Sequence, residues 1–123
     1  MISQKELERL RREGEKRLWY STRGLREALK GWLTPMMWDF SRFIEELPKE
    51  EYLEYSSMKE WVFKWLATIF DEMIEIDRVD VIIIGKKRFQ SGREIAEWIM
   101  QKEKDLIDYI LKELHSTYIA SML

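Results

Sequence analysis

The fold of this 123-residue chain follows mainly from residues 56–80, SSMKEWVFKWLATIFDEMIEIDRVD. Apolar side chains return there at steps of three and four residues, the spacing of one face of an α-helix. This face carries Met58, Trp61, Val62, Trp65, Leu66, Ile69, Met73, Ile76 and Val79, and it is widened by Phe63, Phe70 and Ile74. A helix with so wide an apolar face is buried on two sides. The stretch therefore predicts a long central helix that begins near Ser56 and Ser57.

Toward the N-terminus, capping residues predict further helices. Thr34 before Pro35 is typical of a helix start, and Pro48 would end that helix. Ser3 and Glu6 have the spacing of a capping box, and the helix they open would continue in a stripe that runs to Leu18. Gly14 favours a bend or an end, and Ser21 and Thr22 are suited to cap a second piece. The residues alone leave open whether this region is one helix or two.

Beyond the central helix, the pattern is ambiguous at one point. Residues 81–84, VIII, fit either a β-strand or the last turn of the central helix. We expect helix, because we find no second β-rich run nearby to pair with a strand. Ser91 and Glu94 form another capping box, which predicts one long closing helix that reaches about Tyr118. The acidic residues 49–55 would form a short helix or a loop.

These elements predict a single all-α domain over residues 1–123, a compact bundle of four to six helices with a long central helix. The composition agrees with this class, because 46% of the residues are apolar and Gly (5) and Pro (2) are scarce. We expect Trp61, Trp65 and Trp98 to meet in the core. Six tryptophans are many for one small bundle, so we expect some at the surface, where large aromatic side chains often contact a partner. The candidates for such an interface are Trp19, Trp32 and Trp38.

The sequence offers little for catalysis or for a cofactor. The chain has no cysteine, which excludes disulfides, zinc-thiolate sites and thiol catalysis. The single histidine, His115, is best explained as a residue near a helix C-terminus. Residues 71–80 hold five carboxylates but no Glu-x-x-His motif, so we interpret them as a solvated acidic face rather than a di-metal site. We therefore expect no enzyme, no cofactor and no bound metal.

Charge is distributed unevenly along a chain whose formal net charge is only −2. Residues 1–33 carry nine basic and five acidic groups, whereas residues 34–80 carry five basic and twelve acidic groups. A local basic cluster, which includes the aromatic Phe89, is a candidate contact for DNA or RNA. Its members are Lys86, Lys87, Arg88 and Arg93. A near-neutral chain confines any such contact to a local surface.

The start of the chain, MISQKE, lacks an apolar leader, so we expect a cytoplasmic protein with no membrane segment. The absence of cysteine and asparagine, together with many Lys, Glu and Arg, is typical of proteins from thermophiles.

With its helices placed, the chain resembles the helical domain of archaeal GINS subunits. The resemblance lies first in Leu33-Thr34-Pro35, which leads into Asp39-Phe40 and Phe43-Ile44. It continues in Ile69, Ile76, Arg78 and the Ile82-Ile83-Ile84 run, similar to the central helix of that family, and in a closing helix over residues 97–113. It implies a non-enzymatic scaffold that packs with other helical subunits, as a homo- or hetero-oligomer, and supports the replicative helicase in DNA replication. The alternatives are a small helical subunit of an RNA-guided (CRISPR) effector that contacts nucleic acid, or an archaeal viral or plasmid protein.

Overall fold

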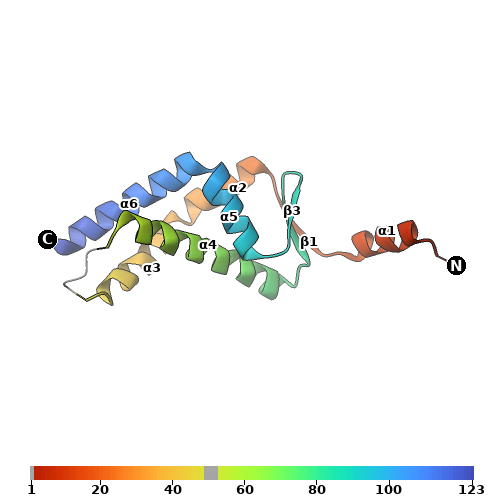
Figure 1. Cartoon of the computed structure of the whole chain (residues 1–123), viewed down its shortest axis with the longest axis horizontal. Coiled ribbons are helices and arrows are strands. Elements are labelled where there is room, and N and C mark those ends of the chain that lie inside the picture. The colour runs from red at the N-terminus through yellow and green to blue at the C-terminus, as the bar shows by residue number, and fades with distance from the viewer. Residues whose placement is uncertain (1, 49–52) are drawn as a thin grey trace.

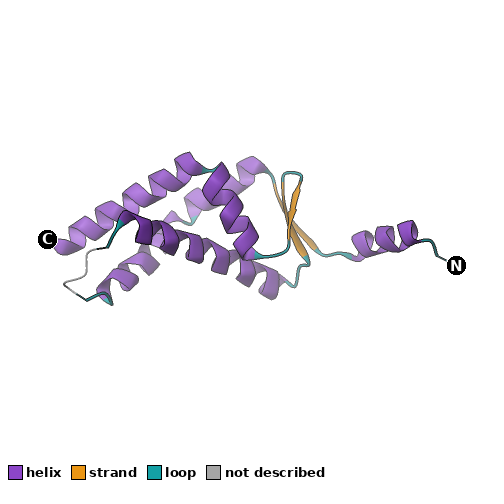
Figure 2. Ribbon diagram, in the orientation of Figure 1, coloured by secondary structure: helices purple, strands orange, loops and turns teal. Residues whose placement is uncertain are grey.

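The computed structural model describes residues 2–48 and 53–123, which form a mostly helical body, a small sheet and a projecting N-terminal helix (Figures 1 and 2). The elements follow one another as α1 (Gln4–Gly14), β1 (Arg17–Tyr20), α2 (Thr22–Gly31), α3 (Leu33–Glu45), α4 (Tyr55–Asp77), β2 (Val81–Ile84), β3 (Lys87–Phe89), α5 (Gly92–Lys102) and α6 (Lys104–Met122). The prediction of a helical bundle around a long central helix is confirmed, because α4 has 23 residues. The prediction that the domain is all-α is wrong, because a three-stranded sheet is present.

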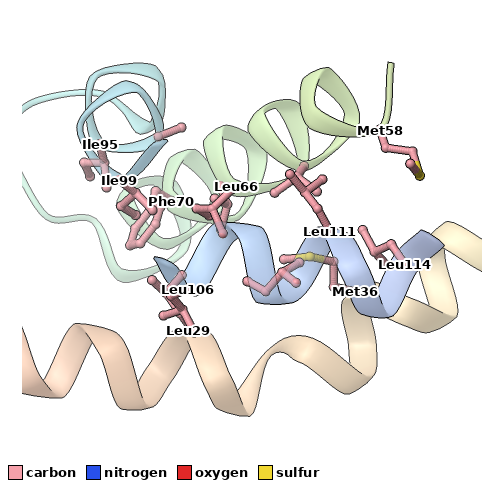
Figure 3. Close-up of a cluster of buried hydrophobic side chains, with 14 of the residues drawn as sticks. Leu29, Met36, Met58, Leu66, Phe70, Ile95, Ile99, Leu106, Leu111 and Leu114 are labelled. Atoms are coloured by element: carbon pink, nitrogen blue, oxygen red, sulfur yellow. The ribbon is translucent and has the colours of Figure 1, made fainter. Parts of the chain in front are cut away.

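Helix α4 contacts both α5 and α6, and α6 also packs against α3 (Figure 3). The core between them is formed by fully buried side chains such as Leu66 and Phe70 of α4, Ile99 of α5 and Leu114 of α6. The predicted burial of residues 58–70 is confirmed for Met58, Val62, Leu66 and Phe70. The same predicted face also includes Trp61, Trp65 and Ile69, which are only partly buried. Near the end of α4 the apolar periodicity wrongly predicts burial of Ile76, which is 77% exposed. The segment 49–52, for which a short helix or a loop was expected, lies outside the described residues.

One close contact fixes α5 against α4. The backbone nitrogen of Gly92 donates a hydrogen bond of 2.6 Å to Oδ1 of Asp71. A Cβ atom added at Gly92 would lie 2.0 Å from the carbonyl oxygen of Ala67. Glycine is therefore needed at this helix start because two backbones approach more closely than a side chain permits.

The sheet corrects the prediction for residues 81–84, which form strand β2 and not the last helical turn. Strand β2 pairs in parallel with β1, where Trp19 lies opposite Ile83, and antiparallel with β3, where Ile83 lies opposite Arg88. Both partner strands were missed because they are short edge strands. Strand β3 begins with the charged residues Lys87 and Arg88, and Leu18 of β1 was assigned to the stripe of the first helix. Two residues with positive φ direct the chain here: Arg78 (φ 51) ends α4, and Gly85 (φ 64) begins the two-residue turn between β2 and β3. The part of the GINS resemblance that assigned Ile82–Ile84 to a central helix is corrected as well.

The capping predictions were correct at Ser3, Ser21 and Ser91, whose hydroxyls accept backbone hydrogen bonds of 3.2, 2.9 and 3.3 Å. The region before residue 33 contains two helices, and Leu18 belongs to strand β1 rather than to the first helix. The predicted cap at Thr34 is wrong, because α3 begins at Leu33 with Trp32 as its N-cap. Pro35 is tolerated within the first turn, where its missing N–H has no helical partner to lose.

The predicted long closing helix is divided into α5 and α6 at Glu103, whose backbone (φ −113, ψ 43) is not helical. The Glu103 side chain is buried and ion-paired with Arg26 of α2. The break between α5 and α6 therefore coincides with a tertiary ion pair. The sequence has no glycine or proline at this point that would predict it.

Candidate binding surfaces

Helix α1 extends away from the rest of the molecule at one end of its long axis (Figure 1). Its apolar residues Leu7 and Leu10 are 48% and 47% exposed. The backbone nitrogen of Lys16, just after the helix, donates a hydrogen bond of 3.0 Å to Asp80, and its carbonyl oxygen accepts one from Asp80. The base of α1 is therefore fixed to the body, while its leucine stripe faces outward.

A surface groove of about 410 Å³ lies between α3 and α4. Its apolar lining comes from Trp61, Trp65 and Ile69, and Asp39 and Glu72 add carboxylates. The indole nitrogen of Trp65 donates a hydrogen bond of 2.7 Å to Asp39, which holds the ring in place. The groove is thus apolar, with two carboxylates and the ammonium group of Lys64 among its lining residues.

Trp61, Trp65 and Trp98 do not meet in the core as predicted. Trp98 packs edge-on against Phe89 with ring centroids 5.7 Å apart, whereas Trp61 and Trp65 contact rings of α3 and Trp32. Of the three interface candidates, Trp32 is partly buried against Phe70 at 5.5 Å. Trp19 and Trp38 are 62% and 67% exposed, so they alone of the three offer large surface aromatics.

The structure brings together three of the four residues of the predicted basic cluster. Lys86, Lys87 and Arg88 lie in the β2–β3 hairpin, and the indole nitrogen of Trp19 donates a hydrogen bond of 3.2 Å to Gly85 at its turn. Arg93 lies instead on α5, paired with Glu97 at 3.2 Å. Sequence reasoning treated Trp19 and this cluster as separate features, because 66 residues lie between Trp19 and Gly85.

Glu15, which sequence reasoning did not single out, links the hairpin to the chain after α1. Both of its carboxylate oxygens accept hydrogen bonds from Arg88, one at 2.6 Å, and Oε2 lies 3.4 Å from Nε of Arg17. The hydrogen bond from Arg88 lowers the pKa of the Glu15 carboxyl, assisted by the charges of Arg88 and Arg17. Glu15 therefore stays ionised at a lower pH than a free glutamate does, and its charge holds the two guanidinium groups together.

A second cleft, of about 420 Å³, lies between α2 and α6 beside Arg26 and Asp105. Arg26 hydrogen-bonds to Glu103 and, at 3.1 Å, to Asp105. The hydrogen bond from Arg26 lowers the pKa of Asp105. Because its charged groups already satisfy one another, we interpret this cleft as part of the α2–α6 junction.

The acidic residues 71–80 are not only a solvated face. Asp71 accepts the hydrogen bond from Gly92, and Asp80 accepts the one from Lys16. Among the residues that the structure describes, no three His, Cys, Asp or Glu side chains are grouped so that they could hold a metal ion. His115 lies inside α6, which continues to Met122, so its predicted place near a helix C-terminus is wrong.

No family model, curated protein or solved structure matches this chain. In the described residues, no helix combines the length and the apolar character needed to cross a bilayer.

Proposed function

We propose that this chain is a non-enzymatic assembly protein, in which helix α1 of one copy docks into the α3–α4 groove of a second copy. The observation that carries the proposal is the position of α1, an eleven-residue helix that extends from the body with Leu7 and Leu10 about half exposed. Isolated helices shorter than about 12–15 residues are marginal in water. A helix of this length is therefore best explained by a partner surface that covers its apolar stripe.

The chemistry of the groove supports a second copy as that partner. Two leucines three residues apart on a helix suit an apolar groove, and the groove supplies Trp61, Trp65 and Ile69. The charges are weakly complementary, since α1 carries four basic and three acidic groups and the groove lining carries two carboxylates and one ammonium group. In a two-fold dimer this contact would be made twice.

The expected affinity is modest. Burial of a leucine side chain contributes about 1.5–3 kcal/mol, and association itself costs at least about 4 kcal/mol. Four leucines in a reciprocal dimer would therefore give a micromolar dissociation constant at best, about −8 kcal/mol. The oligomeric state should be measured at about 100 µM protein for that reason.

The test is sedimentation velocity or light scattering on the wild type and on the Leu7→Glu/Leu10→Glu variant. We expect a dimer for the wild type, a monomer for the double variant, and equal helicity and thermal stability of the body. Ile119→Glu, at an exposed apolar position of α6, is the matched control and should remain dimeric. A wild type that stays monomeric, or a double variant that stays dimeric, would contradict the proposal.

The GINS resemblance extends this proposal to a cellular role in which such an assembly supports the replicative helicase. Its support is the sequence pattern over residues 33–78, which lies mainly on α3 and α4. Specific co-purification with subunits of the replicative helicase from the native host, lost in the Ile69→Glu groove variant, would test the role.

A further inference from the structure

The outer face of the small sheet combines an exposed aromatic ring with cations. Residues paired across neighbouring strands point to the same side of a sheet, so Trp19, Ile83 and Arg88 form one row across it. Arg17, two residues before Trp19, lies on the same face. The other face packs into the core through buried Ile82, Ile84 and Phe89. The row with Trp19 is therefore the solvent side.

The Trp19 ring is held in place although it is exposed. Its indole nitrogen donates to the carbonyl oxygen of Gly85 at 3.2 Å, so its only polar atom is already satisfied within the protein. The ring remains 62% exposed. A fixed, exposed aromatic side chain loses little conformational freedom when a planar group stacks on it.

We propose that this outer face binds single-stranded nucleic acid, with a base stacked on Trp19 and the adjacent phosphates held by Arg17 and Arg88 of the face and by Lys86 of the adjoining β2–β3 turn. Stacking on an aromatic ring combined with backbone contacts by basic residues is the general mode of single-strand recognition. A single strand fits better than a duplex because its bases are free to leave their neighbours and stack on a protein ring. The site goes beyond the proposed assembly function and does not depend on it.

Glu15 provides a specific test of the proposed phosphate contacts. Its carboxylate contacts Arg88 and lies 3.4 Å from Arg17, so it occupies the position between two guanidinium groups that a phosphate would bridge. The side chain is 16% exposed, so it covers these cations rather than extending into solvent. A bound phosphate must displace Glu15 or share the cations with it. Removal of the Glu15 charge should therefore tighten binding, the opposite of what loss of a purely structural ion pair would do.

Lys87 and Arg93 do not belong to the face. The Lys87 ammonium lies 5.7 Å from the centroid of the Phe89 ring, on the side of the hairpin that faces the core. Arg93 is on α5 and pairs with Glu97. Arg93→Gln is therefore a matched control for Arg88→Gln, since both variants remove one guanidinium that has a carboxylate partner.

The experiment is fluorescence anisotropy with labelled 12-mers of oligo(dT), oligo(U) and a mixed-sequence duplex, at 50 to 200 mM salt. We expect binding of both single strands, with a slope of log K against log salt of about −2 from three phosphate contacts. Trp19→Ala should weaken binding about tenfold or more, whereas Trp19→Phe should retain most of it. Arg88→Gln and Lys86→Gln should each weaken it several-fold, Arg93→Gln should leave it unchanged, and Glu15→Gln should tighten it.

The proposal would be overturned by the absence of binding of either single strand at 50 mM salt or by equal binding of the wild type and Trp19→Ala. Equal losses in Arg93→Gln and Arg88→Gln, or weaker binding by Glu15→Gln, would overturn it too. Duplex binding that matches single-strand binding would also overturn it, because a stacked base would then play no part. The Leu7→Glu/Leu10→Glu variant separates the two proposals. This variant should be monomeric and should still bind single strands. The dimer proposal and the nucleic-acid proposal can therefore fail independently of each other.

Discussion

The substitution Gly92→Ala tests the close approach of α5 to α4. Helix α5 also contacts strand β3 of the hairpin. The added Cβ would lie 2.0 Å from the Ala67 carbonyl oxygen and 2.8 Å from the Asp71 nitrogen, where about 3.4 Å is ordinary contact. Both neighbours are backbone atoms of α4, so no side-chain rotation relieves the clash. Overpacking in a core costs about 1–3 kcal/mol, and the hydrogen bond from Gly92 to Asp71 would be lengthened as well.

We expect Gly92→Ala to lose about 3 kcal/mol or more, which for a domain of this size lowers Tm by about 10 °C or more. The assay is thermal and urea unfolding followed by far-UV circular dichroism. The control is Gly31→Ala at the end of α2, where no heavy atom lies within 4 Å of the added Cβ and φ is not positive. That change should be neutral or stabilise the protein by up to about 1 kcal/mol. A Gly92→Ala protein whose Tm stays within about 2 °C of the wild type would refute the close approach of the two helices.

Three further outcomes are expected. Leu66→Ala, at a fully buried position of α4, should lower the free energy of unfolding by about 2–5 kcal/mol in urea titrations, with an unchanged m-value. Ser21→Ala removes the hydroxyl that caps α2 and should cost about 1 kcal/mol in the same assay, whereas Ser56→Ala, whose hydroxyl bonds only a carboxylate in the described structure, should change little. The depressed pKa values of Asp105 and Glu15 stabilise the fold above the ordinary carboxyl range, and this contribution is lost as the pH falls through their folded values. Tm should therefore fall as the pH is lowered below about 4, less steeply in Asp105→Asn, and an equal slope in that variant would contradict the assignment to Asp105.

The sequence predicted the helical body because its elements carry their own signals. The face of α4 is periodic over residues 58–70, and the serine caps at Ser3, Ser21 and Ser91 satisfy helix ends within four residues of chain. Such local patterns need no knowledge of distant partners. They also explain why the long central helix and the starts of α1, α2 and α5 were predictable.

The parts that were missed depend on distant contacts. Strand β2 has four apolar residues, but its partners Arg17–Tyr20 and Lys87–Phe89 become strands only by pairing with it. The break at Glu103 accompanies an ion pair with Arg26, 77 residues away. Neither contact leaves a periodic signal in the sequence, so neither could be derived from it.

The candidate nucleic-acid face could be recognised only from the pairing register of the strands, because composition does not show which side of the sheet a residue lies on. In β1, Leu18 and Tyr20 pack against the core, so the alternation of a strand requires Trp19 to point outward. A shift of the pairing by one residue would bury Trp19 and expose Leu18 and Tyr20. The fold uses the side chain at that outward position for one hydrogen bond to Gly85, yet the position holds a large, 62% exposed aromatic residue in the same row as Ile83 and Arg88. Since only that one hydrogen bond ties the tryptophan to the fold, binding is the better explanation for its large exposed ring. Trp19→Thr should lower the stability by no more than about 1 kcal/mol, the loss of one hydrogen bond, while it abolishes stacking.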